Sequence, residues 1–174
     1  MIFLKILSKF IRVLRSAASP NQIAWGFALG AIAGLTPLNA LHNLAVLILL
    51  IILNVNIAAA ILALTIFSLI AWLFDPFFHT IGYAVLVQLS WLRPAWTDLY
   101  NAPVAPLTRF NNTVVMGGLL TSLVLLIPNY LLFRWFVIRY RESWNDRIRK
   151  WKVVQILKSS KIVRFYLKIR GMEG

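Results

Sequence analysis

Three side chains in this sequence could do proton or metal chemistry, and they stand in otherwise apolar surroundings. Asp75 and His79 are four residues apart, which puts a carboxylate and an imidazole on one face of a helix. With His42 they would form a set of two histidines and one carboxylate, which can bind zinc. Nothing in the sequence brings His42 to the other two, and Asp75 directly before Pro76 is also typical of an N-cap. We favour the structural cap, with the proton or metal site as the alternative.

No other pattern in the chain resembles an enzyme active site. The sequence has no cysteine, which excludes thiolate nucleophiles, disulfides and cysteine metal sites. It also lacks a Ser/His/Asp set, a pair of carboxylates and a phosphate-binding loop. We therefore predict that the protein is not an enzyme and that it holds no metal and no cofactor.

The candidate residues stand in or beside a long apolar run. Residues 16–74 contain no Asp, Glu, Lys or Arg. Because about 20 helical residues cross a hydrocarbon core of about 30 Å, this run must fold back at least once. A soluble protein would need many more polar residues to cover such a run, and here 60% of all residues are hydrophobic. The sequence predicts an all-α, multi-pass membrane protein.

Polar interruptions divide the apolar run at residues 36–39 and 54–56. They predict two short helices, 20–35 and 38–53, because a proline between them prevents one straight helix. The pair either crosses the membrane twice or forms a re-entrant hairpin, whose polar tip must then lie inside protein or beside water. The tip residues are Thr36, Pro37, Asn39, His42 and Asn43.

The first helix of this hairpin has one face nearly bare of side chains. Ser19, Pro20 and Gln22 have the pattern of a capping box at its start. Glycines then recur at a spacing of four, which in lipid allows another helix to approach closely. We predict that these glycines contact a partner or lipid, together with the polar tip. They are Gly26, Gly30 and Gly34.

Two further helices, 57–74 and 113–133, are long and apolar enough to cross the membrane. The second contains Gly117 and Gly118 for helix contact, and Pro128 predicts a kink. The polar residues before it are suited to capping, which we favour, and to contact with an anionic headgroup. They are Arg109, Asn111 and Asn112.

Basic residues gather at both ends of the chain. Residues 1–15 carry four basic residues and no acid, and residues 134–174 carry twelve basic and three acidic residues. Lys and Arg beside membrane spans are retained in the cytoplasm, so we predict cytoplasmic termini in a bacterial inner membrane, with residues 93–112 outside.

Both basic ends also have the apolar periodicity of amphipathic helices. We predict an interfacial helix in residues 1–18, a membrane domain in 19–133 and a cytoplasmic tail in 134–174, with both ends on anionic headgroups. A cleavable signal peptide is the alternative for the first segment, although Lys9 and Arg12 interrupt its apolar region. Nucleic acid is excluded as a partner, because the aromatic residues of the tail are segregated from its charges.

Several segments resemble a known family. They are SPNQIAWGFALGAIAGLTPLNALHNLAVL, LFDPFFHTIG and LYNAPVAPLTRFNNTVVMG, and with their neighbours they cover nearly the whole chain. The sequence is similar to an uncharacterised family of bacterial inner-membrane proteins related to the domain of unknown function DUF2062. Ala40 replaces a usual glycine and Asp75 a usual asparagine, which implies a subgroup. The resemblance implies a larger periplasmic partner and brings no catalytic residues.

These observations lead to two hypotheses about function. In the first, the protein is a non-enzymatic inner-membrane subunit that anchors or feeds a larger envelope protein, in phospholipid transport. In the second, it is an autonomous small transporter whose hairpin tip binds substrate near the membrane midplane. Co-purification distinguishes them, because only the first requires a stable large partner.

Overall fold

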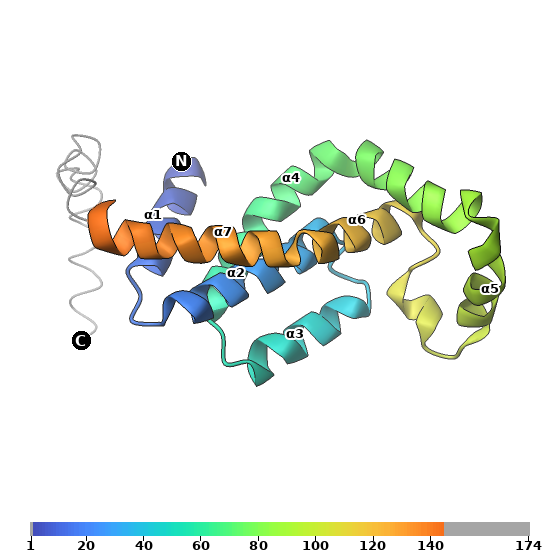
Figure 1. Ribbon diagram of the computed structural model, residues 1–174, viewed down its shortest axis with the longest axis horizontal. Coiled ribbons are helices and arrows are strands. Elements are labelled where there is room, and N and C mark those ends of the chain that lie inside the picture. Colours follow the sequence, from blue (N-terminus) through green and yellow to red (C-terminus); the bar gives the residue numbers. More distant parts are fainter. Residues whose placement is uncertain (1, 145–174) are drawn as a thin grey trace. The chain divides into compact units, whose positions relative to one another are not determined.

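The computed structural model describes residues 2–144, with side chains from residue 6 to 142, and all of its regular elements are helical. The chain divides into two compact units, residues 1–137 and 138–174, and we describe each by itself. The predicted periodicity in the tail lies almost wholly outside the described residues. The prediction of an all-α protein is confirmed for residues 2–144 (Figure 1).

The first half of the chain forms four helices joined by short turns. They are α1 (Ile2–Leu14), α2 (Pro20–Leu35), α3 (His42–Ile52) and α4 (Ile57–Tyr83). The predicted capping box is present, since Ser19 Oγ accepts from the Gln22 N–H at 3.2 Å and Gln22 Oε1 accepts from the Ser19 N–H at 2.9 Å. Both polar interruptions are turns, and α2 has the predicted bounds.

The second half begins with short irregular helices and ends with two longer ones. The short ones are η1 (Ala84–Gln88), η2 (Ser90–Leu92), α5 (Arg93–Asn101) and η3 (Ala105–Thr108). The longer ones are α6 (Thr113–Val124) and α7 (Leu126–Arg139), and of the second unit the structure describes the end of α7 and η4 (Tyr140–Trp144). The predicted amphipathic segment near the N-terminus is helical as α1, which begins the first unit.

The predicted N-cap at Asp75 is wrong. Helix α4 continues through Asp75 and Pro76 to Tyr83, so Asp75 lies inside the helix and caps nothing. Proline removes one backbone donor, and here the helix changes direction along its length instead of ending (Figure 1). One turn later the Thr80 hydroxyl donates to the Pro76 carbonyl at 3.0 Å.

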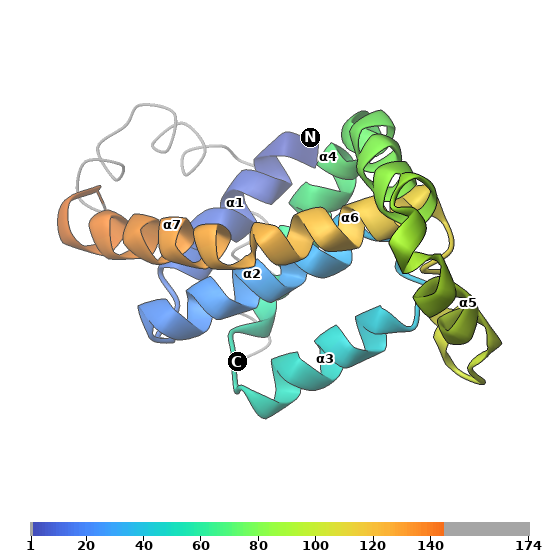
Figure 2. The same ribbon diagram turned by 45° about the vertical axis from the view of Figure 1, so that its right-hand side comes forward.

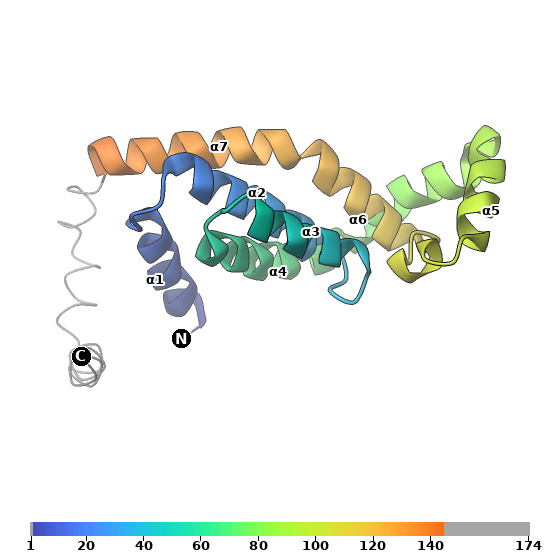
Figure 3. The ribbon, with the colours of Figure 1, turned by 90° about the horizontal axis from the view of Figure 1, so that it is seen from below.

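The predicted kink near Pro128 is present between α6 and α7. The two helices meet at Leu125 with a bend of 50° (Figure 3). Pro128 cannot donate to the carbonyl four residues before it, that of Val124, and its ring crowds this oxygen. The bend therefore falls on the turn before the proline.

Helix α2 is the centre of the first unit and is buried from Ile23 to Leu35 except for the half-buried Trp25. Helix α3 returns beside it as the second limb of a hairpin (Figure 2). Buried residues of α2 and α3 form one cluster with partly buried residues of α3, α4, α6 and α7. Its members are Leu29, Ile32, Ala33 and Val46, with Leu50, Leu64, Leu119 and Leu126 packed against them.

Outside this core, the described helices expose many large apolar side chains. In α3 only Val46 is buried, and Ile51 and Ile52 are 67% and 69% exposed. In α4, Trp72 is 80% and Leu73 70% exposed. By length and composition, residues 57–88 form one candidate membrane span, and the bent α6–α7 pair is a second if it counts as one span.

Candidate functional site

The glycine ladder, which consists of Gly26, Gly30 and Gly34 of α2, is buried and packs against α4. A Cβ on Gly26 would meet the Asn56 carbonyl oxygen, and a Cβ on Gly30 would meet that of Ala60. At Gly34 it would lie 2.7 Å from Phe67 Cβ. The close helix contact is therefore present, but these glycines are buried and offer no surface to a partner or to lipid. The expectation that they contact either one is corrected.

Other glycines bring α6 equally close to α4 and α2. A Cβ on Gly82 of α4 would meet the Thr113 carbonyl oxygen, and one on Gly117 would meet that of Phe78. A Cβ on Gly118 would lie 2.6 Å from the Leu35 carbonyl oxygen at the end of α2. In the first unit, helices α2, α4 and α6 thus pack so closely that their backbones are in contact at the glycines.

The order of these contacts fixes the direction of each helix. Residues 26, 30 and 34 of α2 meet residues 56, 60 and 64–67 of α4, so these two helices run parallel. Residues 113 and 117 of α6 meet residues 82 and 78 of α4, so α6 runs antiparallel to both. The α2–α3 hairpin therefore lies along the first part of α4, and α6 begins along the last part.

The two ends of the hairpin are held together at its base. Gln22 Nε2 donates to the Asn54 carbonyl at 3.1 Å, and the Asn56 N–H donates to the Gln22 carbonyl at 3.0 Å. Asn56 also caps α4, since its Oδ1 accepts from the Ala59 N–H at 2.9 Å. This closed base brings the end of α3 back to the level at which α2 begins.

Hydrogen bonds within the chain satisfy several polar groups at the hairpin tip, although the buried ring nitrogens of His42 have no partner in the described chain. Asn43 Nδ2 donates to the Pro37 carbonyl at 2.8 Å, and the Thr36 hydroxyl donates to the Ile32 carbonyl at 2.9 Å. The Ala40 N–H donates to the Pro37 carbonyl at 3.1 Å. These turns occupy residues 37–41, which is why α3 begins at His42 and not at the predicted Leu38.

The tip is tied to the segment that precedes α6. The Leu41 N–H donates to the Leu107 carbonyl at 3.2 Å. Arg109 has left-handed backbone geometry with φ of 57°, and this conformation ends η3. With the Asn39 amide oriented to satisfy both groups, its oxygen accepts from Arg109 Nη1 and Nη2 at 3.1 and 3.2 Å. The structure thus unites the predicted residues Asn39 and Arg109, which are 70 positions apart in the sequence.

An open groove of about 430 Å³ lies at this junction. Most of its lining is apolar and comes from the tip, the first turns of α3 and η3. The lining residues are Leu38, Asn39, Ala40, Leu41, Asn43, Leu44, Leu47 and Leu107. Four of these leucines are more than half exposed, so the groove is a hydrophobic surface with amide groups at one side.

The two asparagines before α6 have different positions. Asn112 is the N-cap, because its Oδ1 accepts from the N–H groups of Val114 and Val115 at 2.9 and 3.2 Å. Asn111 is exposed. The favoured capping role is thus confirmed for Asn112, and Arg109 contributes through its bond to Asn39 instead.

The structure does not bring together Asp75, His79 and His42, the residues of the alternative metal site. Among the described residues no group of three His, Cys, Asp or Glu side chains could hold a metal ion. His79 Nδ1 is 2.6 Å from Thr113 Oγ1, which joins α4 to α6, whereas His42 stands at the start of α3 beside the Thr108 backbone. Both ring nitrogens of His42 are buried and make no hydrogen bond within the described chain.

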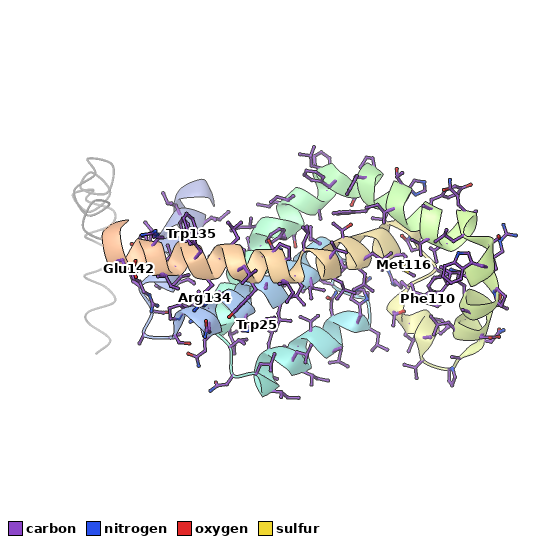
Figure 4. The ribbon with its side chains drawn as sticks, in the orientation of Figure 1. Trp25, Phe110, Met116, Arg134, Trp135 and Glu142 are labelled. Carbon is purple, nitrogen blue, oxygen red and sulfur yellow. The ribbon has the colours of Figure 1, made fainter. Side chains whose placement is uncertain are left out.

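One polar cluster was missed in the sequence. Asn21 Oδ1 accepts from Arg134 Nε at 2.7 Å and from the Tyr130 hydroxyl at 3.2 Å, and the Tyr130 ring stacks on Trp25 with centroids 4.4 Å apart. Figure 4 shows Trp25 and Arg134 near each other, far from Phe110. Since these contacts join residues more than 100 positions apart, no local pattern could have revealed them.

Comparisons with known proteins identify one family. Residues 5–145 match the family described as "Uncharacterized protein conserved in bacteria (DUF2062)". A protein of Treponema pallidum (strain Nichols), which is named an uncharacterized protein, is 28% identical over 145 residues. These residues cover 83% of this chain and 89% of the relative. No solved structure matches the chain.

Proposed function

This chain belongs to the bacterial DUF2062 family, and we propose that it is a non-enzymatic, multi-pass subunit of the bacterial inner membrane. In this proposal it anchors or feeds a larger envelope protein in phospholipid transport. The observation that carries the membrane part is the exposed apolar surface of α3 and α4. Side chains such as Ile52 and Trp72, 69% and 80% exposed, need a non-aqueous neighbour.

The helix directions support a membrane topology of one re-entrant hairpin and two crossings. Helix α3 has 11 residues and is about 16 Å long, too short to cross a core of about 30 Å. The α2–α3 hairpin therefore enters and returns, α4 crosses, and the bent α6–α7 pair crosses back. The start of α2 and residue 134 then lie on one side, as the Asn21–Arg134 bond requires. The basic ends place that side in the cytoplasm.

A subunit role agrees better with the hairpin tip than a transporter role does. A transporter with a midplane site would offer free backbone groups to its substrate, as discontinuous helices do. In this hairpin the Thr36 and Asn43 side chains and the backbone N–H groups of residues 40 and 41 bond within the chain, to residues 32, 37 and 107. Because these backbone groups are already bonded, they do not require a lipid headgroup, and the proposed lipid contact at the tip rests on side chains.

Two exposed tryptophans provide a test of membrane embedding. Trp72 lies in the candidate span and Trp91 lies between that span and the predicted outer segment, residues 93–112, and they are 80% and 74% exposed. A lysine at the centre of a span disfavours insertion by about 3 kcal/mol. We expect Trp72→Lys to lose most of the protein from carbonate-washed membranes and Trp91→Lys to retain it. Equal recovery of the two variants would contradict the proposed span.

The partner is tested by purification from native membranes without crosslinker, followed by mass spectrometry. The proposed function predicts one larger envelope protein in stoichiometric amount. A lone oligomer of this chain would support the transporter instead.

Topology is checked with single cysteines, since the chain has none of its own. An impermeant reagent should label Tyr100→Cys and not Lys150→Cys in intact cells.

A further inference from the structure

The groove at the hairpin tip combines an apolar hollow with one positive charge beside it. Leu38 and Leu107 are each 61% exposed, and Leu44 and Leu47 are each 52% exposed, although all four line the same groove. Leucines from two separate segments thus face an open volume of about 430 Å³. In a membrane an acyl chain would fill this volume by packing against the leucines, since lipid tails are as apolar as leucine side chains.

The charge beside the groove is Arg109. Asn39, which lines the groove, accepts from both terminal nitrogens of the Arg109 guanidinium. This bond fixes the guanidinium at the side of the groove, and it engages a neutral acceptor, so the positive charge is not neutralised. Arg109 is exposed, and no ion pair joins it to a carboxylate of the described chain. A guanidinium in this state can bind a phosphate with two hydrogen bonds.

We propose that this groove binds one phospholipid with an anionic headgroup. Its phosphate contacts Arg109, and one acyl chain lies between the leucines of the tip, α3 and η3. A partner helix or a second copy of this chain would cover the leucines and leave the guanidinium without an anion. The inference rests on the proposed function, because the groove meets lipid only if the tip is in the membrane.

The test is native mass spectrometry of the full chain in detergent, titrated with phosphatidylglycerol or phosphatidylcholine of equal acyl chains. Both lipids carry a phosphate, but the choline cation offsets its charge in phosphatidylcholine, so we expect the first phosphatidylglycerol to bind about tenfold more tightly. Arg109→Gln should abolish this preference, since it removes the charge and keeps an unbranched polar side chain at this position. Arg93→Gln is the matched control, because Arg93 is also exposed and only reaches the Val87 carbonyl at 3.4 Å.

Two further variants cover the case in which Arg109→Gln does not fold. Asn39→Asp keeps the shape of the tip and puts a carboxylate on the guanidinium, so it should also remove the preference. Leu47→Trp fills the groove and should weaken both lipids. Equal affinities in the parent and Asn39→Asp would overturn the inference. So would competition by inorganic phosphate alone, since the site would then recognise a free anion.

These outcomes are separable from the proposed function. If the protein is recovered from washed membranes but shows no preference between the two lipids, only the lipid site is wrong. If Trp72→Lys is recovered as well as the parent, the membrane span itself is wrong, and the groove must have another occupant.

Discussion

Replacing Gly30 by alanine would test whether backbone contact between α2 and α4 holds the first unit together. The new Cβ would meet the Ala60 carbonyl oxygen and would lie 2.7 Å from Ala60 Cα and 2.8 Å from Ala60 C. All three neighbours are backbone atoms, so no side chain can rotate away. To reach an ordinary contact of 3.4 Å or more, the two helices must separate.

Two opposing effects decide the size of the change. Alanine is favoured over glycine inside a helix by about 1 kcal/mol. Overpacking of a well-packed core costs about 1–3 kcal/mol. Because Gly26 and Gly34 contact α4 on the same face, separation at Gly30 also loosens both neighbouring contacts. We therefore expect the upper end of this range to apply, and a net loss of about 2 kcal/mol in the free energy of unfolding.

The measurement is unfolding in mixed micelles, followed by circular dichroism, for Gly30→Ala and Gly30→Leu. Leucine should be worse than alanine, because its longer side chain meets the same backbone. Ala45→Leu is the matched control, since Ala45 is exposed on α3 and should tolerate the change. If Gly30→Ala were as stable as the parent, or more stable by the helix-propensity term, the close contact between α2 and α4 would be refuted.

Three further stability changes follow from single contacts and are measured in the same way. Asn112→Ala removes the cap of α6 and should cost about 1 kcal/mol; an unchanged stability would argue against the cap. Asp75→Ala should be neutral or stabilising by about 0.5 kcal/mol, because Asp75 lies inside α4; a loss of about 1 kcal/mol would restore the cap there. Asn21→Ala should cost about 1 kcal/mol by removing the acceptor of Arg134, whereas Asn21→Asp should keep or raise stability; equal losses would exclude the hydrogen bond as the cause.

Local patterns predicted the helix boundaries well where the chemistry is local. The capping box at Ser19 and Gln22 needs residues three positions apart, so the sequence alone was sufficient to place the start of α2. The bend before Pro128 likewise follows from one missing N–H and the carbonyl four residues earlier. Such effects act within one helical turn.

The same reasoning failed at Asp75, where a local pattern competes with packing. Asp-Pro is a common start of a helix, but here Phe78 and Gly82 on the far side of Pro76 are packed against α6. These contacts keep residues 77–83 in line with α4, so proline bends the helix without ending it. Tertiary contacts of this kind are not visible in a window of ten residues.

The candidate site was predicted in its parts and not in its assembly. The polar tip and Arg109 were both identified as contact residues, but only the fold shows that Asn39 holds Arg109. The glycine ladder was predicted to lie in a helix contact, but its spacing does not show which helix packs against it. In this chain that helix is α4, so the glycines are buried and do not lie on an outer surface.

The parallel pairing of α2 with α4 has a consequence for synthesis. Helix α2 is made first, yet its glycine face is covered only after α3 has returned and residues 56–67 of α4 have followed. Its other contacts come later still, since Gly118 reaches Leu35 and Phe133 stacks on Phe27. During translation the apolar α2 therefore stays unpaired until these later segments have been made. A ribosome that stalls before residue 113 would leave a nascent chain whose central helix lacks its final neighbours, and such exposed apolar surface favours aggregation.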